Sequence, residues 1–286
     1  MARIGVLGGS GLYELDGLSN LREERVETPF GDPSDALLYG TLGEHELVFL
    51  PRHGRGHRFN PSEVNYRANI WALKQAGVEF ILSVSAVGSL EEGVAPGDVV
   101  VIDQFIDRTK GRAATFFEGG VVGHVSFGDP VCGTLRGYLL DACAKTEAKV
   151  HDGGTYVCME GPAFSTRAES NLYRSWGARV IGMTNLPEAK LAREAEISYA
   201  TLAMVTDYDC WHTGHDDVTV EQVIATLRRN VSTAKQVIAY AVPHIAAHQG
   251  AAPAAGAMNN AIMTAKELIP QDRRAALAVI AGKYLG

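Results

Sequence analysis

The chain has 286 residues, of which 46% are hydrophobic and 21% charged, so we expect one large domain with a sizeable core. Its formal net charge is −7, and no stretch concentrates lysine or arginine, which argues against a nucleic-acid partner. Because no signal peptide and no apolar run of roughly 20 residues is apparent, we expect a soluble, cytoplasmic protein without membrane contact.

Apolar and β-branched segments alternate with segments of helical period along most of the chain. The predicted strands cover residues 3–7, 46–50, 80–84, 99–102, 155–159, 180–183 and 199–205. The predicted helices cover residues 62–76, 133–144 and 166–176, a segment beginning at 184–186, and a long segment from residue 219. This alternation predicts an α/β fold whose mixed, mostly parallel twisted sheet is flanked by helices on both faces.

We expect this domain to span residues 1–249. Residues 250–257 are rich in alanine, glycine and proline and predict a linker. Beyond it, residues 265–267 and 271–284 predict helices that dock weakly or on a neighbouring molecule. Residues 250–286 are therefore predicted to form a linker and a C-terminal helical tail.

The first predicted strand leads into Gly8-Gly9-Ser10-Gly11-Leu12. Glycines let backbone N–H groups converge on an anion, and the Ser10 hydroxyl adds a donor. Glu14 stands where the dinucleotide fingerprint needs its third glycine, so a nicotinamide cofactor and a dehydrogenase activity are disfavoured.

Three later strand ends also carry groups suited to phosphate. Arg52 offers a planar fork and His53 a ring N–H after the second strand, and Ser85-Ala86 forms a small-residue turn after the third. Thr184 lies at the start of a helix, whose free N–H groups and positive dipole end attract anions. Together with Ser10, these residues predict a site for a small oxyanion.

Two acids, Asp207 and Asp209, follow the strand predicted at residues 199–205. Open α/β sheets bind ligands beyond the carboxyl ends of their strands. Burying two unpaired carboxylates would cost several kcal/mol. A ligand that carries N–H groups, such as a nitrogen heterocycle, would be a suitable partner.

Two loops complete the candidate regions. Residues 103–123 predict a long irregular segment, and its aromatic residues Phe116 and Phe117 indicate that it packs on the body or on a second subunit. Residues 212–218 contain two histidines and two aspartates, but neither they nor the four cysteines have a metal-ligand spacing. We therefore expect no metal and reduced thiols.

Many collinear motifs across residues 3 to 245 carry a family resemblance. They include G-G-S-G-L, T-P-F-G-D-P-S-D, R-H-G-R-G-H, V-N-Y-R-A-N-I-W-A-L-K, D-Q-F-I-D-R-T, E-G-P-A-F-S-T-R-A-E-S, G-M-T-N-L-P-E-A and T-D-Y-D-C-W. With these motifs the sequence resembles the methylthioadenosine phosphorylases of the trimeric purine nucleoside phosphorylase superfamily. The resemblance implies a three-layer phosphorylase-type fold and a homotrimer with a shared active site. It also implies that phosphate displaces adenine from 5′-methylthioadenosine, with phosphate as a co-substrate and no cofactor.

The resemblance also assigns roles position by position. Phosphate would be held by Ser10, Arg52, His53, Ser85, Ala86 and Thr184. The nucleoside would contact Met183, Phe164, His57, Val223 and Ile224, with His124 reaching in from the adjacent subunit. Asp207 and Asp209 would face the purine N7 and 6-amino edge, and with His53 they form the implied catalytic group. Ser165 and Val220 would tune specificity.

The residue types fit this chemistry. Breaking the N-glycosidic bond creates positive charge at C1′, which a nearby phosphate anion stabilises. A protonated carboxyl of the acid pair would assist the leaving purine at N7, and the other carboxylate would accept from the 6-amino group. A 6-oxopurine would leave polar groups unpaired there. A 6-oxopurine nucleoside or methylthioinosine phosphorylase remains the alternative, and a noncatalytic purine-nucleoside sensor a remote one.

Overall fold

The structure is a computed structural model that describes residues 2–9, 11–212 and 220–286, the last range with side chains from residue 226 on. Its strands belong to one 11-stranded sheet, and six of the ten strand pairings are parallel. The strands are β1 (Ile4–Gly8), β2 (Leu18–Glu24), β3 (Leu37–Leu42), β4 (His45–Pro51), β5 (Phe80–Ser89), β6 (Val99–Val101), β7 (Gln104–Arg108), β8 (Val150–Asp152), β9 (Thr155–Met159), β10 (Ala178–Gly182) and β11 (Ser198–Asp207). The mixed, mostly parallel sheet predicted from the sequence is confirmed.

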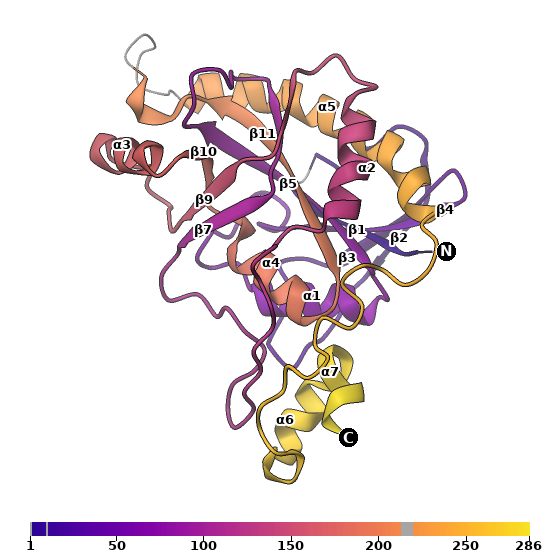
Figure 1. Cartoon of the computed structure of the whole chain (residues 1–286). Helices are drawn as coiled ribbons and strands as arrows, with labels where there is room; N and C mark the ends of the chain where they lie inside the picture. Colours follow the sequence, from indigo (N-terminus) through magenta and orange to yellow (C-terminus); the bar gives the residue numbers. More distant parts are fainter. Residues whose placement is uncertain (1, 10, 213–219) are drawn as a thin grey trace.

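Helices pack on the sheet in two groups, which gives the predicted three layers (Figure 1). In one group, α2 and α5 pack against β11. In the other, α4 packs against β5 and β11, and α1 packs on α4. The helices are α1 (Tyr66–Gln75), α2 (Gly133–Cys143), α3 (Arg167–Ser175), α4 (Asn185–Glu194), α5 (Val220–Ala246), α6 (Gln271–Ala276) and α7 (Ala278–Leu285), with short 3₁₀ turns η1 (Asp209–Trp211) and η2 (Lys266–Leu268). Helix α3 begins with a capping box, in which the side chains of Thr166 and Glu169 each accept a hydrogen bond from the other residue's backbone N–H.

Strand β5 is the centre of the sheet. It runs parallel to β1 on one side and to β11 on the other, and its last two residues pair antiparallel with β10. The predicted turn at residues 85–89 is therefore wrong, since the strand continues to Ser89. These small residues stay extended because β10 and β11 supply hydrogen-bonding partners for their backbone.

A second difference concerns residues 103–123, predicted to be irregular throughout. Residues Gln104–Arg108 form β7, which pairs in parallel with β9. The strand was hard to predict because its side chains are exposed or half-buried and carry no clear alternation. The irregular loop is thus shorter and begins at residue 109.

The C-terminal tail packs firmly on the body, contrary to the predicted weak docking. Met258 and Leu277 are fully buried within the main core. The tail also pairs with the long loop: His124 N donates to Ala261 O at 2.9 Å, and Met263 N donates to Val122 O at 2.8 Å. The tail therefore fixes the backbone that carries His124.

Glu194, at the end of α4, holds the middle of the same loop. Its carboxylate accepts hydrogen bonds from the Thr115 hydroxyl and the Phe116 N–H, each at 2.7 Å. Burial raises the pKa of the Glu194 carboxyl to about 7, against the pull of the two hydrogen bonds.

This pKa predicts a pH-dependent stability. Between pH 4.5 and about 7 the folded state retains a proton that the unfolded chain has released, so stability falls as pH rises through this window. A shift of this size corresponds to a free energy on the order of 3 kcal/mol. We expect Glu194→Gln to remove this part of the pH dependence, measured as urea midpoints at pH 5 and pH 8. Parallel pH profiles of the two proteins would contradict the assignment.

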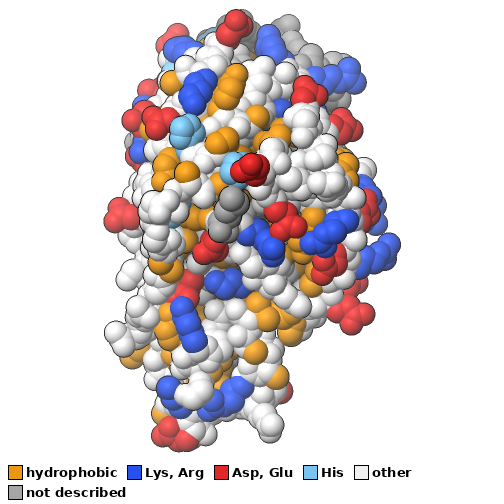
Figure 2. All heavy atoms as spheres, turned by 90° about the vertical axis from the view of Figure 1, so that its right-hand side faces the viewer, with side chains coloured by type: hydrophobic (Ala, Val, Ile, Leu, Met, Phe, Trp, Pro, Cys, Tyr) orange, Lys and Arg blue, Asp and Glu red, His pale blue; other side chains and the backbone are white. Residues whose placement is uncertain are grey.

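On the face shown in Figure 2, acidic and basic side chains are interspersed, and neither sign of charge gathers into one large patch. Within the described ranges, no helix combines the length and apolar character needed to cross a bilayer. Those ranges also hold no group of three or more His, Cys, Asp or Glu residues arranged to bind a metal ion. Most of the loop at 212–218 lies outside them, so the expectation that it binds no metal stays a prediction.

Candidate functional site

The register of β5 and β10 brings two of the predicted oxyanion donors together. Ile181 lies opposite Gly88 in an antiparallel pair. Thr184 comes three residues after Ile181, just beyond the end of β10, and Ser85 comes three residues before Gly88 on β5. The two residues are therefore neighbours, and their hydroxyl oxygens are 3.3 Å apart. Ala86, the next residue of β5, is exposed between buried neighbours. Solvent therefore reaches the strand directly beside these two buried hydroxyl residues.

The Thr184 hydroxyl is available because it does not cap the helix that follows. Thr184 is the N-cap of α4 but makes no side-chain capping hydrogen bond. Asn185, the next residue, does not cap the helix with its side chain either. Asn185 is fully buried, and its amide donates to Ser83 Oγ at 3.0 Å and to the Tyr199 hydroxyl at 2.8 Å.

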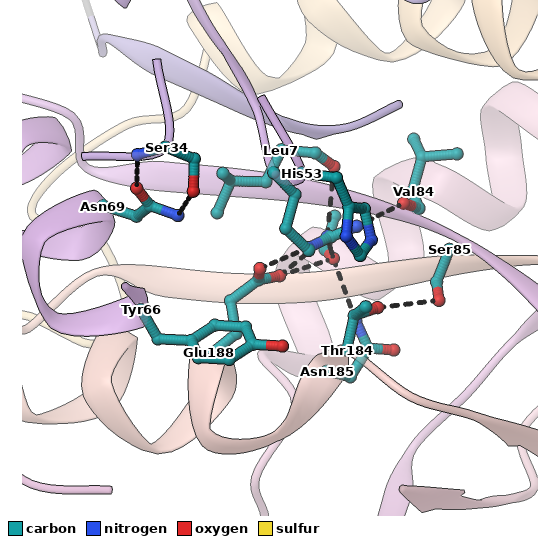
Figure 3. A network of polar contacts seen from close by, with 12 residues as sticks. Leu7, Ser34, His53, Tyr66, Asn69, Val84, Ser85, Thr184, Asn185 and Glu188 are labelled. Carbon is teal, nitrogen blue, oxygen red and sulfur yellow. Dashed lines mark hydrogen bonds and ion pairs between the residues drawn. The ribbon is translucent and has the colours of Figure 1, made fainter. Parts of the chain in front are cut away.

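Arg52 follows β4 and turns its guanidinium inward, onto Glu188 of α4. Arg52 Nε lies 2.6 Å from Glu188 Oε2, and Nη2 lies 2.9 Å from Oε1. Nη2 also donates to Ser83 Oγ, and Nη1 donates to Val84 O at 3.1 Å. In Figure 3 the dashed contacts run from the Glu188 carboxylate on the left to Thr184 and Ser85 on the right. The fork predicted to grip phosphate is thus occupied, and among the described partners only one N–H of Nη1 is left for another acceptor.

His53 is a neutral ring of defined tautomer. Its Nδ1 lies 2.8 Å from Phe59 O, and because a carbonyl only accepts, Nδ1 carries the proton. Burial and, second, the charge of Arg52 lower the pKa of His53 to about 4. At neutral pH, Nε2 is therefore an acceptor rather than the expected donor. His57, which is exposed, stacks on this ring with centroids 4.3 Å apart.

The acid pair sits where β11 is irregular. The register shifts between Val205 and Asp207, a bulge at Thr206 that places Asp207 opposite Gly88. The Thr206 hydroxyl donates to Asp207 Oδ2 at 2.6 Å, and Asp209 N donates to Asp207 Oδ1 at 2.8 Å. Asp209 Oδ2 is buried and has no partner among the described groups.

Burial raises the pKa of both carboxyls, and the charge of Asp207 adds to the rise at Asp209. Asp209 also holds a positive φ of 54°, which is uncommon outside glycine. An unsatisfied buried oxygen beside a second carboxyl with a raised pKa is the arrangement that a ligand with N–H groups or ring nitrogens would complete.

Gly88 keeps room for the acid pair. A Cβ at this position would lie 3.0 Å from Asp207 Oδ1 and 3.3 Å from Asp209 Cβ. We expect Gly88→Ala to displace the carboxyls by a few tenths of an ångström and to lower kcat by up to about tenfold, since turnover depends steeply on the position of the acting groups. Gly93→Ala is the matched control, because no atom lies within 4 Å of its added Cβ. Equal turnover of the two variants would contradict this role.

The segment after β9 lies against the acid pair. Cys210 Sγ donates to Ser165 O at 3.2 Å, and Ser165 is itself buried. Phe164, the preceding residue, is 68% exposed. The structure thus places Ser165 next to the acids and Phe164 on the surface.

Arg112 of the long loop joins two site segments. Its side chain is 2% exposed, and its Nη1 donates to Met183 O at 2.7 Å and to Leu186 O at 2.8 Å. Its Nη2 donates to Glu160 O at 2.6 Å, at the start of the segment that carries Phe164. Arg112 therefore holds the backbone on both sides of Thr184.

The structure brings together Arg52, His53, Ser85, Thr184 and Met183 on one side and Asp207, Asp209 and Ser165 on the other. Four predicted residues lie outside what it describes: Ser10, and the side chains of Val220, Val223 and Ile224 in α5. His124 is exposed on the loop that the tail fixes, and its reach into a neighbouring subunit stays a prediction.

Glu188, Arg112 and Gly88 were not predicted. Glu188 resembled an ordinary acid in the first turn of a helix, and Arg112 lay in a loop without periodicity. The sequence signal for Glu188 is its position, four residues after Thr184 in the helix that begins at the predicted anion site.

The comparisons with known proteins agree with this geometry. The family model described as the phosphorylase superfamily matches residues 3–243. S-methyl-5′-thioadenosine phosphorylases from Thermosynechococcus vestitus and Geobacter sulfurreducens are 56% and 58% identical to the chain, each covering 99% of both sequences. A solved methylthioadenosine phosphorylase from an antarctic soil metagenomic library superposes with a TM-score of 0.93 at 50% identity, over 98% of each chain. The Schistosoma mansoni methylthioadenosine phosphorylase, solved with adenine, gives 0.86 at 37% identity, over 92% of this chain and 99% of its own.

Proposed function

The chain belongs to the phosphorylase superfamily, among the S-methyl-5′-thioadenosine phosphorylases, and we propose that it cleaves 5′-methylthioadenosine with inorganic phosphate. The products are adenine and 5-methylthioribose 1-phosphate, which makes the enzyme a pentosyltransferase of purine and methionine salvage. One observation carries the proposal: the Ser85–Thr184 hydroxyl pair and the acid pair both lie beside β5, the first at Ser85 and the second at Gly88, three residues further along this strand. Three strand residues span about 10 Å, which leaves room for a sugar between phosphate and base.

The reaction follows from the two ends of this site. A phosphate oxygen forms a bond to C1′ while the C1′–N9 bond breaks and its electron pair leaves on the purine. The bound phosphate anion stabilises the positive charge that develops on the sugar. The phosphate is held by the hydroxyls of Ser85 and Thr184 and by backbone N–H groups of the turn around Thr184. The Nε2 of neutral His53 accepts the hydrogen of a monoprotonated phosphate.

The acid pair acts on the base. Because burial raises the pKa of both carboxyls, one of them holds a proton more readily than an exposed acid and donates it toward N7. The other carboxylate accepts a hydrogen bond from the 6-amino group. A 6-oxo group would meet an acceptor there, which disfavours hypoxanthine nucleosides by a few kcal/mol.

The test is release of purine from 5′-methylthioadenosine and from 5′-methylthioinosine, each with and without phosphate, followed by chromatography. Phosphate-dependent release of adenine with little hypoxanthine is expected. Preference for the inosine analogue would overturn the base assignment, and release without phosphate would show a nucleosidase.

The same proposal includes a homotrimer in which His124 completes a neighbour's site, and reduced thiols in the cytoplasm. Val122 and Met263, which flank the His124 backbone, expose 47% and 66% of their surface, and a subunit contact would cover them. Sedimentation equilibrium tests the trimer, and a monomeric mass at micromolar concentration would reject it. In a reducing compartment the four cysteines would stay as the free thiols described here.

A further inference from the structure

Two guanidinium groups border the Ser85–Thr184 hydroxyl pair, and each is paired with a carboxylate. Arg52 donates to Val84 O, one residue before Ser85, and is bound through two contacts to Glu188. Arg112 donates to Met183 O, one residue before Thr184, and lies 3.3 Å from the Glu160 carboxylate. Because each guanidinium is paired with a carboxylate, the two arginines add no net charge beside Ser85 and Thr184.

The Arg52–Glu188 pair is sealed from solvent, with 3% and 1% of the side chains exposed. Glu188 Oε1 also accepts from the hydroxyls of Ser83 and Tyr199, each at 2.8 Å. Four donors thus hold this carboxylate in place. A buried ion pair adds little stability over apolar side chains of equal volume, so stability alone does not account for it.

We propose that Glu188 is a positioning residue that neutralises Arg52, so that phosphate bound beside Ser85 and Thr184 keeps its negative charge toward the sugar. The inference rests on the proposed phosphorolysis. His53, the residue after Arg52, supports it, because its ring is a neutral acceptor and adds no positive charge.

The physical reason is that negative charge moves from the phosphate to the sugar during the reaction. Phosphate loses negative charge as its oxygen bonds to C1′, so an uncompensated cation beside it would stabilise the bound anion more than the transition state. Phosphate would then bind tightly and react slowly. With Glu188 present, Arg52 supplies one N–H and orientation, and the field of the anion acts on the sugar.

Glu188→Gln tests the proposal through opposite changes in two constants. We expect the KM for phosphate to fall about tenfold and kcat to fall about tenfold or more, because ground-state binding gains and the transition state does not. Calorimetric titration of the variant with inorganic phosphate alone should also show tighter binding. Weaker phosphate binding in this titration would overturn the proposal.

Glu196→Gln is the matched control. Its carboxylate is also buried and paired, 2.6 Å from Lys283, but it binds the C-terminal tail rather than the site. We expect it to lose stability without a change in phosphate affinity. A tightening of phosphate binding in this control would show a general charge effect and would overturn the specific role of Glu188.

The double variant Arg52→Met with Glu188→Met decides the matter if the single variant does not fold, because it leaves no unpaired buried charge. We expect its phosphate dissociation constant to rise about tenfold, the loss of one hydrogen bond to a charged group. A rise above about a thousandfold would show that Arg52 supplies its full charge. Titration with phosphate alone separates this inference from the proposed function, which is tested on the wild-type protein by phosphate-dependent release of purine.

Discussion

Asp207→Asn is expected to lower kcat for adenine release by about 10² to 10⁴-fold, the usual contribution of a positioned general acid. The amide has no proton acidic enough to pass to the leaving purine, and the coupled pair loses one of its carboxyls. The amide fits the site, since its NH₂ group can donate to the Thr206 hydroxyl, whose own proton can then turn from residue 207 to Val87 O, 3.2 Å away. The effect is therefore expected in turnover rather than in stability.

The measurement is initial-rate kinetics together with thermal unfolding. Asp107→Asn is the control, because its carboxylate is paired 2.5 Å from Lys190 outside the acid pair. We expect the control to keep wild-type turnover. If Asp207→Asn retained kcat within about threefold of wild type, Asp207 would have no part in the chemistry.

Arg112→Met is expected to cost stability and phosphate affinity together. It removes the donors of three backbone carbonyls, those of Met183, Leu186 and Glu160. Losing a buried charged side chain that donates several hydrogen bonds lowers the free energy of unfolding by on the order of 3–5 kcal/mol. Because the turn around Thr184 loosens, the KM for phosphate should rise about tenfold. Denaturant unfolding and phosphate-dependent kinetics measure the two effects.

Arg193→Met is the matched control for this change. Arg193 also donates to loop carbonyls, Ser126 O at 2.9 Å and Asp129 O at 2.6 Å, on a half-exposed surface. We expect a small loss of stability and an unchanged KM for phosphate. A similar rise in KM for both variants would mean that Arg112 acts only through global stability.

Local patterns predicted the elements that have strong periodicity. The strand Thr155–Met159 was predicted at its observed bounds, and the helix Gly133–Cys143 within one residue. Predictions failed where a strand depends on distant partners. Residues 85–89 read as a turn because they are small, and they are extended because β10 and β11 lie beside them.

The candidate site shows the same division. The sequence by itself determined the α/β class, the residue types at the strand ends, the two acids and the family, because these depend on residue identity and order. Only the tertiary structure decided how the charges are used. Glu188 lies 136 positions from Arg52 in the sequence yet occupies its guanidinium fork, and the Phe59 carbonyl fixes the tautomer of His53. Such pairings depend on which strands are neighbours and in which register, and a local pattern of residues does not encode either.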